Sequence, residues 1–498
     1  MSKAKSANIV TVTSPTDGST VRFVYEDPKQ GGVKDVYFDP NKQYAVAFFR
    51  KKLDFNGKER INRLVGPYRQ SIFEREGGDY WKPLFRWPEK VVEYDGRTGI
   101  VLPFYEKHFF FGPKTSLAGA EKEGYWFASA KNFNKSVPPE EKGALLGFLQ
   151  VCLNLSRATK RLHAAGLAHS DLSYKNCLID PTSGSACIID IDGLVVPSLF
   201  PPDVVGTRDF IAPEVVATMH LRSDDKNRVL PTRSTDLHAL AVLIYIYLFH
   251  RHPLRGSKFY SVDTDVQETH EMGQDALFVE HPTDASNRVR IEANDQPFLP
   301  WIDTAKNPYK IMGPYLKELF DQAFVKGLHQ PNLRPTADDW ENALVKTLDM
   351  IQPCSNPKCV KKWFVFDNTS KPSCPYCGTP FSGILPVLDF YSSRDGKSFR
   401  ADNHRLMVFP NQYLYQWHVD RNVFPNERIT DEQKKAVGYF IFHQDKWLFV
   451  NQTLQTLKDL TRDKMIPPKS YVELTEGLQL HLSNAPSGRL ARVILVKA

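Results

Sequence analysis

Three polar residues near the middle of the chain have the types and spacing needed for phosphoryl transfer. Asp171 and Asn176 lie five residues apart in one expected loop, and the apolar run 187–189 leads into Asp190. A carboxylate can accept the proton of an attacking hydroxyl, while an amide and a second carboxylate can hold the Mg²⁺ ions that neutralise the β- and γ-phosphates. Turns also use Asp and Asn, so ordinary loop residues are the alternative interpretation of this stretch taken alone.

Three further motifs follow in the chain. Residues 205–214 read Val-Gly-Thr-Arg-Asp-Phe-Ile-Ala-Pro-Glu, residues 234–240 read Ser-Thr-Asp-Leu-His-Ala-Leu, and residues 333–336 read Leu-Arg-Pro-Thr. With the first loop, these motifs resemble the signatures of the protein-kinase superfamily, and they occur in the family's order. The resemblance predicts a bilobed protein-kinase-like fold.

The resemblance also implies roles for individual residues. Asp171, Asn176 and Asp190 would be the catalytic residues, with Asn176 and Asp190 binding Mg²⁺. Glu214 and Arg334 would form an ion pair, and Asp236 would have a structural role. ATP and Mg²⁺ are the cofactors that such a domain implies.

A glycine pair at Gly31 and Gly32 begins a stretch that resembles the kinase glycine-rich loop. Glycines between strands let backbone amides approach phosphate oxygens, although an ordinary hairpin turn is the alternative. Lys34 stands at the third glycine position, and Ala47 stands where the family has its phosphate-pairing lysine. Lys34 is one candidate for the missing cation, and the others lie in the segment 50–52.

The rest of the expected nucleotide site comes from three other segments. Residues 101–105 correspond to the family's hinge, which implies that Leu102 lies at the adenine. Asp192 stands at the family's glycine position next to Asp190 and adds an acid that could assist Mg²⁺. Glu59 is the candidate for the helix glutamate, and Ser170 replaces the arginine that receives an activation-loop phosphate, so control by such a phosphate is not expected.

Length and composition limit the class of protein. A chain of 498 residues predicts two to four domains. The net charge of +7 is spread without long blocks, which argues against nucleic-acid binding. The longest apolar run, residues 240–249, is too short for a membrane span, and residues 1–6 show no secretory signal. We therefore expect a cytoplasmic protein with no membrane partner.

Four late cysteines have the spacing of a zinc site. Cys354 and Cys359 form one pair, and Cys374 and Cys377 form the next. Two such pairs can place four thiolates around one Zn²⁺, and four filled positions make the ion structural. Disulfides are the alternative, which a cytosolic location disfavours. We predict a zinc ribbon over residues 351–382.

The segment 385–498 has alternating apolar and polar residues in short runs, which predicts a small all-β sandwich. Its closing sequence resembles the second half of a forkhead-associated domain, but the phosphothreonine-reading signatures of that family are not visible. The complete expectation is therefore a multidomain α+β chain: a lead-in or added strand at 1–20, a kinase-like domain at 21–350, the ribbon, and the sandwich. The polar insertion 251–301 has few helix or strand cues.

This combination of domains resembles the kinase component of bacterial tellurium-resistance-associated stress systems. The resemblance implies an ATP-dependent protein kinase with a protein substrate, a serine or threonine acceptor being favoured. It also implies two partners, a von Willebrand factor A-domain protein and a metal-dependent protein phosphatase. Two alternatives stay open: a pseudokinase that binds nucleotide without catalysis, and a scaffold that acts through its ribbon and sandwich.

Overall fold

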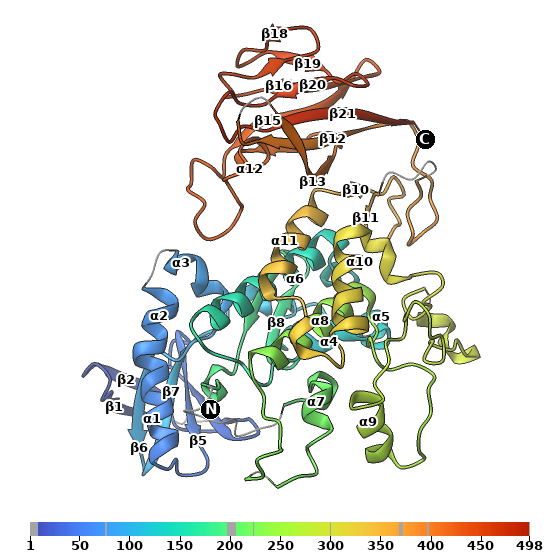
Figure 1. Ribbon diagram of the computed structural model, residues 1–498. Helices are drawn as coiled ribbons and strands as arrows, with labels where there is room; N and C mark the ends of the chain where they lie inside the picture. The colour runs from blue at the N-terminus through green and yellow to red at the C-terminus, as the bar shows by residue number, and fades with distance from the viewer. Residues whose placement is uncertain are drawn as a thin grey trace. The chain divides into compact units, whose positions relative to one another are not determined.

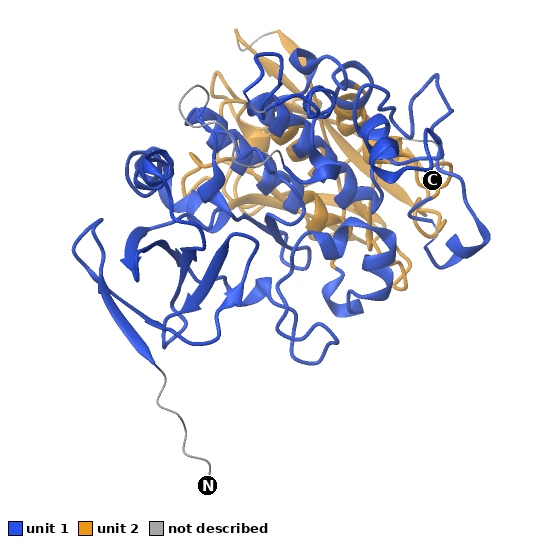
Figure 2. Cartoon of the chain, turned by 90° about the horizontal axis from the view of Figure 1, so that it is seen from below, with its two compact units in different colours: residues 1–142, 150–302, 322–338 blue, residues 143–149, 303–321, 339–498 orange. Residues whose placement is uncertain are grey.

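The computed structural model describes residues 8–74, 77–196, 206–222, 224–298, 300–367, 372–395 and 398–497. The chain forms two compact units (Figure 2). Unit 1 comprises residues 1–142, 150–302 and 322–338, and unit 2 comprises residues 143–149, 303–321 and 339–498. The predicted domain boundary at 350 therefore differs from the observed one, because residues 303–321 and 339–350 group with the C-terminal segments.

A five-stranded antiparallel sheet forms the N-terminal part of unit 1, in the order β3-β4-β5-β7-β6. The strands are β3 (Lys29–Gln30), β4 (Lys34–Phe38), β5 (Tyr44–Phe49), β6 (Lys90–Tyr94) and β7 (Arg97–Pro103). Phe23, Tyr37, Phe48 and Val92 form the buried core on this sheet. The turn between β3 and β4 contains the glycine pair.

A hairpin precedes this sheet, where the sequence predicted a lead-in or an added strand. Strands β1 (Ile9–Thr13) and β2 (Thr20–Val24) pair antiparallel, and Phe23 is buried in the core of the sheet. The Ser14 hydroxyl donates a hydrogen bond of 2.7 Å to the Val91 carbonyl. The folded chain therefore begins earlier than residue 21.

Helices α1 (Phe55–Arg63) and α2 (Arg69–Phe73) run beside this sheet (Figure 1). A π-helical turn, η1 (Leu64–Tyr68), joins them and contains Gly66 and Pro67. Proline removes a backbone donor, so it interrupts the regular helix at this point. The short helix α3 (Gly78–Trp81) follows.

The remaining part of unit 1 is mainly helical. Its α-helices are α4 (Tyr125–Ala128), α5 (Ala130–Lys135), α6 (Leu145–Ala164), α7 (Pro213–Val216), α8 (Arg233–Phe249) and α9 (Thr264–Met272), with α6 beginning in unit 2. Short 3₁₀ turns lie at η2 (Lys82–Leu84), η3 (Lys107–Phe109), η4 (Pro139–Glu141), η5 (Ile191–Gly193), η6 (Arg208–Phe210), η7 (Ala293–Phe298) and η10 (Pro331–Leu333), and a π turn lies at η9 (Gln322–Lys326). A capping box of Thr232 and Thr235 starts α8, most of whose residues are buried.

Two details of this part concern the site. The hairpin of β8 (Cys177–Asp180) and β9 (Ser185–Ile188) follows the loop that contains Asp171. The segment 251–301, in which the sequence shows few helix or strand cues, contains α9, whose first turn is capped by the Asp263 carboxylate. In the described ranges, every helix is too short or too polar to cross a lipid bilayer.

Unit 2 contains helices, a two-stranded sheet and two larger β-sheets. It begins with η8 (Tyr309–Met312), α10 (Gly313–Asp321), most of α11 (Ala337–Leu348) and the paired strands β10 (Ile351–Pro353) and β11 (Trp363–Val365). One sheet has the order β13-β12-β21-β20-β17-β18 and the other β14-β15-β16-β19. Leu388 and Leu406 of the first sheet share a buried cluster with Phe440 and Phe449 of the second, so the two sheets pack face to face. We call residues 384–497 the two-sheet domain.

The elements of the two-sheet domain are β12 (Ile384–Ser393), β13 (Phe399–Met407), β14 (Tyr413–Tyr415), α12 (Gln416–Val419), β15 (Ala436–His443), β16 (Lys446–Asn451), β17 (Lys458–Asp459), β18 (Lys464–Met465), β19 (Tyr471–Glu473), β20 (Gln479–His481) and β21 (Leu490–Lys497). Residues 416–419 lie in one of the alternating runs of 385–498 but form the helix α12. The His418 ring accepts a hydrogen bond from the Tyr415 amide at its first turn.

Candidate active site

The loop between α6 and β8 holds Asp171 and Asn176 in contact. The Asn176 side-chain amide donates to the Asp171 carbonyl at 2.8 Å and to its carboxylate Oδ2 at 2.9 Å. The other carboxylate oxygen, Oδ1, accepts the Thr207 backbone amide at 2.7 Å. Two donors from different segments thus fix the orientation of the Asp171 carboxylate.

Helix α8 positions this loop through Asp236. The Asp236 carboxylate, only 2% exposed, accepts the backbone amides of His169 at 2.7 Å and Ser170 at 3.0 Å. It also contacts His163 Nε2 at 3.1 Å. Ser170 has a φ of 65°, a strained conformation for a residue with a side chain, and the two bonds to Asp236 compensate for it. The buried helix therefore holds the loop in shape.

Asp190 and Asp192 follow β9 and meet Lys34 from β4. The Lys34 ammonium lies 2.8 Å from Asp190 Oδ1 and 2.5 Å from Asp192 Oδ1. The Lys34 and Asp192 side chains are 12% and 10% exposed, whereas that of Asp190 is 51% exposed. Two carboxylates and one ammonium group thus form a compact cluster with one accessible acid.

The charges in this cluster shift the pKa values of its members. Burial disfavours the charged Lys34 ammonium, but the charges of Asp192 and Asp190 outweigh burial and raise its pKa. Burial also opposes ionisation of Asp190, and Lys34 overcomes it and lowers the Asp190 pKa. For Asp192, burial dominates and raises the pKa, and the adjacent Asp190 charge adds to this effect. A bound divalent cation would favour the ionised form of both acids.

Lys34 is the cation that the structure brings to this cluster. On the strand of Ala47, β5, no other residue supplies a cation in its place. Ala47 is 1% exposed on β5 and pairs with Val36 of β4. Arg50, another candidate, pairs with Asp35 at 2.8 Å. Strand β4 therefore supplies the lysine, and it lies beside the strand on which the family places it.

Glu59 lies on α1, the helix on which it was predicted. Its carboxylate pairs with Arg63 of the same helix at 2.7 Å, at the i,i+4 spacing that a helix favours. The Lys34 ammonium contacts Asp190 and Asp192, and not Glu59. The role of Glu59 as the helix glutamate therefore stays a prediction.

The glycine turn and the hinge segment come from the sheet of unit 1. The Gly31 amide donates to the Lys34 carbonyl at 2.9 Å, which closes the β3–β4 hairpin next to the lysine. A Cβ at Gly32 would meet no atom within 4 Å, so the backbone there is open to a ligand. Leu102 of β7 pairs with Ala45 of β5. Farther along, Tyr105 packs on the buried cluster that contains Leu178.

Glu214 and Arg334, 120 residues apart, meet in unit 1. Two guanidinium nitrogens donate to the two carboxylate oxygens at 2.8 and 2.7 Å. The Arg334 side chain is 1% exposed and also donates to the carbonyls of Gly327, Leu328 and Ser234. This bidentate pair connects α7, which ends the segment containing Thr207, to the region before α11.

Replacing Glu214 with alanine is expected to destabilise the protein by about 3 kcal/mol, because Arg334 would lose its only charged partner among the described residues while staying buried. The three hydrogen bonds from Arg334 to backbone carbonyls remain in the variant. They keep the loss of stability at the lower end of the range for buried ion pairs. The measurement is a thermal melt of the full chain. Asp265→Ala, which removes an acid that is 80% exposed and paired with Arg208, is the matched control and should change the melt little. Equal shifts in the two variants would contradict the expectation.

The four late cysteines come together in unit 2. Their sulfur atoms all lie within 4.8 Å of one another, with 3.5 Å between Cys354 and Cys377 and 3.8 Å between Cys359 and Cys374. Thiolates around a tetrahedral Zn²⁺, each about 2.3 Å from the ion, lie about 3.8 Å apart. The cysteines are free thiols, so the donor set and the spacing both fit Zn²⁺.

Thr207 is the site residue that the motif analysis did not assign. Its amide orients Asp171, and its hydroxyl lies 3.3 Å from the Ser173 hydroxyl. In the sequence, the Gly206-Thr207 pair before Ala-Pro-Glu is the signal that could have identified Thr207 as a site residue. Val205, which began that motif, lies outside the described residues.

Comparison with known proteins relates the middle of the chain to protein kinases. Residues 143–340 match the family described as protein kinase domain. The chain is also 27% identical over 164 residues to serine/threonine-protein kinase PSK2 of Saccharomyces cerevisiae. This match covers 33% of the chain and 13% of the yeast protein, so the chain spans a small part of that relative.

Two solved structures are similar to the chain. The Toxoplasma gondii specific rhoptry antigen kinase domain is 14% identical with a TM-score of 0.41, and the match covers 68% of this chain and 86% of that one. The ROP18 kinase domain in complex with AMP-PNP and sucrose is 16% identical with a TM-score of 0.40, covering 68% and 84%.

Proposed function

We propose that this chain, which carries a protein kinase domain, transfers the γ-phosphate of ATP to a hydroxyl group of a protein substrate. The observation that carries the proposal is the contact of Lys34 with Asp190 and Asp192. These two acids follow the loop in which Asn176 contacts Asp171. This contact supplies a cation to a site in which β5, the strand next to β4, has no lysine. A kinase domain of this family uses ATP and Mg²⁺.

Each residue would have a defined task in this reaction. Asp171, oriented by Asn176 and Thr207, would accept the proton of the substrate hydroxyl. Asn176 and Asp190 would bind Mg²⁺, which neutralises phosphate charge when present. Asp192 would assist as a second acid, and Lys34 would move from the acids to the phosphate oxygens.

Gly31, Gly32 and Leu102 would contribute to nucleotide binding. The open backbone at Gly32 is suited to phosphate oxygens, and Leu102 lies on the strand that leads to the hinge. Asp236, Glu214 and Arg334 would maintain the shape of the site without touching the nucleotide. Serine or threonine is the proposed acceptor, supported by the likeness to a serine/threonine-protein kinase.

A nucleotide-binding pseudokinase is the second candidate, and Ala47 favours it. Ala47 leaves its strand without a cation, and the acids now hold Lys34. In such a protein, nucleotide binding would change the shape of the domain, and no phosphate would be transferred. The two functions are distinguished by phosphate transfer and not by binding.

The C-terminal segments give the finer part of the proposal. We propose a structural zinc ribbon at Cys354, Cys359, Cys374 and Cys377, and a forkhead-associated-like fold for the two-sheet domain, without that family's binding activity. The combination supports a place in a bacterial stress-response system of the tellurium-resistance type, with a von Willebrand factor A-domain protein and a metal-dependent phosphatase as partners. Free thiols at all seven cysteines support a reducing, cytoplasmic location.

Lys34→Ala should weaken Mg²⁺-dependent ATP binding by about 10- to 100-fold, because a charge-assisted hydrogen bond contributes about 1.5–3 kcal/mol. Isothermal titration with ATP and Mg²⁺ measures this change, and Lys34→Arg should retain part of the affinity. Lys58→Ala removes an exposed lysine paired with Glu93 and is the matched control. Unchanged ATP affinity in Lys34→Ala would count against Lys34 as the phosphate anchor.

A further inference from the structure

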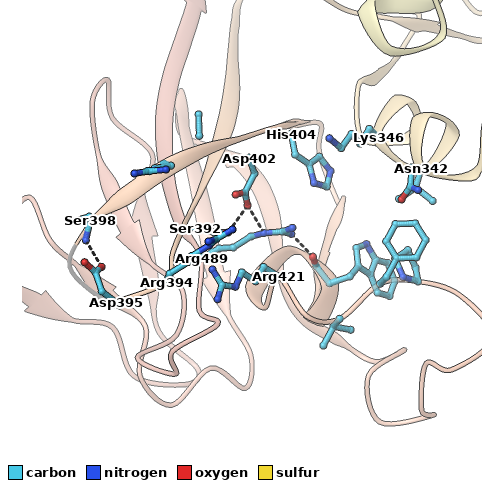
Figure 3. A pocket seen from close by; sticks show the side chains of 17 residues that line it. Asn342, Lys346, Ser392, Arg394, Asp395, Ser398, Asp402, His404, Arg421 and Arg489 are labelled. Carbon is cyan, nitrogen blue, oxygen red and sulfur yellow. Dashed lines mark hydrogen bonds and ion pairs between the residues drawn. The ribbon is translucent and has the colours of Figure 1, made fainter. Parts of the chain in front are cut away.

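Unit 2 contains a cavity of about 610 Å³ that no part of the proposed kinase reaction uses. Its walls come from α11, the β12–β13 hairpin, the region of α12, and the start of β21. Figure 3 shows Asn342 and Lys346 on α11, on one side of this cavity, and Asp402 and His404 on the strand that crosses it. The volume lies in the range of about 300–1,000 Å³ that is usual for small-molecule sites.

Cationic side chains dominate the polar part of this cavity. Lys346, Arg394, Arg400, Arg421 and Arg489 line it, against the two acids Asp395 and Asp402. Both acids have partners: Asp402 accepts Arg489 at 2.8 Å and the Ser392 hydroxyl at 2.7 Å, and Asp395 accepts the Ser393 hydroxyl at 2.7 Å. The acids are therefore occupied, and the lining carries an excess of positive charge.

Arg394, Arg400 and Arg421 have N–H donors that are available to a ligand. Within the described residues, Arg394 and Arg400 form no ion pair, and Arg421 donates to the backbone carbonyl of Ser393 at 2.7 Å. Lys346 donates to the Asn403 carbonyl at 3.0 Å, and burial lowers the pKa of this ammonium group. An anion next to Lys346 would offset that cost of burial, because an opposite charge favours the ionised lysine.

The rest of the lining is apolar and aromatic. Trp417, Val423, Phe424 and Pro425 contribute to this part, together with Val345 of α11. The Trp417 ring stacks on Tyr415, with 4.3 Å between centroids and an interplanar angle of 10°, which holds the indole in place. A planar ring stacks favourably on such a surface.

We propose that this cavity binds a nucleotide, with its phosphates at Arg394, Arg400 and Arg421 and its base against Trp417 and Phe424. Guanidinium groups match phosphate oxygens in geometry, and the adjoining aromatic surface suits a base. A phosphorylated peptide would instead need an extended edge or groove for its backbone, whereas four different elements wall this cavity. The site would be separate from the Lys34 cluster and could bind a regulatory nucleotide.

Photo-crosslinking of the full chain tests this proposal. The probes are 8-azido-ATP and 5-azido-UTP, followed by trypsin digestion and mass spectrometry. Trypsin cleaves after Arg405, Arg421 and Arg428, so label near Trp417 appears on residues 406–421 and label near Phe424 on residues 422–428. We expect one or both peptides to be labelled, and excess inorganic tripolyphosphate to suppress the label.

The variant Arg394→Glu/Arg400→Glu should reduce this label at least about tenfold, since two phosphate contacts become repulsive. Both side chains are exposed, so the fold should be retained. The matched control, Lys464→Glu/Arg492→Glu, makes the same charge change at exposed positions of the same domain outside the cavity and should keep the label. Label on residues 31–34, 101–105 or 171–192 reports the proposed nucleotide site of unit 1 and should be equal in all three proteins.

Three results would overturn the proposal. The first is no label on residues 406–428 with either probe. The second is equal label in the two charge variants. The third is label displaced by a phosphothreonine peptide but by neither tripolyphosphate nor unlabelled nucleotide, which would identify a phosphopeptide site.

Discussion

Asp171→Asn is expected to slow phosphoryl transfer by about 10²–10⁴-fold while leaving the fold and ATP binding intact. The amide keeps the shape of the carboxylate but cannot accept the proton of the attacking hydroxyl. Its oxygen can still accept one of the two donors, Asn176 and Thr207, so the loop should keep its conformation. Incorporation of label from γ-labelled ATP into protein measures the rate.

The control for this variant is Asp224→Asn, the same chemical change at an exposed residue of unit 1. It should transfer phosphate at the parent rate. A transfer rate in Asp171→Asn equal to that of the control would show that Asp171 is not the base. A loss of ATP binding in Asp171→Asn would instead indicate that this residue maintains the nucleotide site.

Replacing Cys374 and Cys377 together with serine is expected to reduce bound zinc from about one equivalent to none and to unfold the ribbon. Among the described residues of this segment, regular backbone pairing is short: β10 and β11 contribute three paired residues each, and an isolated bridge joins Ser373 to Pro380. The segment 352–383 should therefore become sensitive to protease. Metal analysis and limited proteolysis of the full chain measure the two effects.

Lys358→Ala, a change at an exposed residue between the first two cysteines, is the control for the ribbon and should keep both zinc and protease resistance. A zinc chelator added to the parent protein should reproduce the proteolysis of the double variant. Parent protein without zinc, or identical digestion of parent and double variant, would contradict the metal role. ATP binding at the Lys34 site should be unchanged throughout, because that site lies in unit 1.

Local spacing predicted the parts of the site that lie on one stretch of chain. Asp171, Asn176 and Asp190 all fall around a single loop and hairpin, so the motif itself places them together. The contact between Lys34 and Asp192 spans 158 residues and depends on how β4 lies over the second loop. The sequence could offer Lys34 only as one of several candidate cations.

Other differences have equally specific causes. The pair of Glu59 with Arg63 could not be predicted, because it depends on which side of α1 each residue faces. The β1–β2 hairpin carries an alternating pattern at residues 9–13 and 20–24, but its polar composition favoured a lead-in. The cationic cavity could not be predicted at all, because its lining residues lie between positions 342 and 489 on four separate elements.

The most direct test of the central claim is γ-phosphate transfer by the purified full-length protein. The protein is incubated with γ-labelled ATP and Mg²⁺, and both labelled protein and released phosphate are counted, so water can serve as acceptor when the substrate is unknown. The account predicts label well above the Asp171→Asn background, and its loss on removal of Mg²⁺. Tight Mg²⁺-dependent ATP binding with no label above that background would contradict a kinase and leave a pseudokinase.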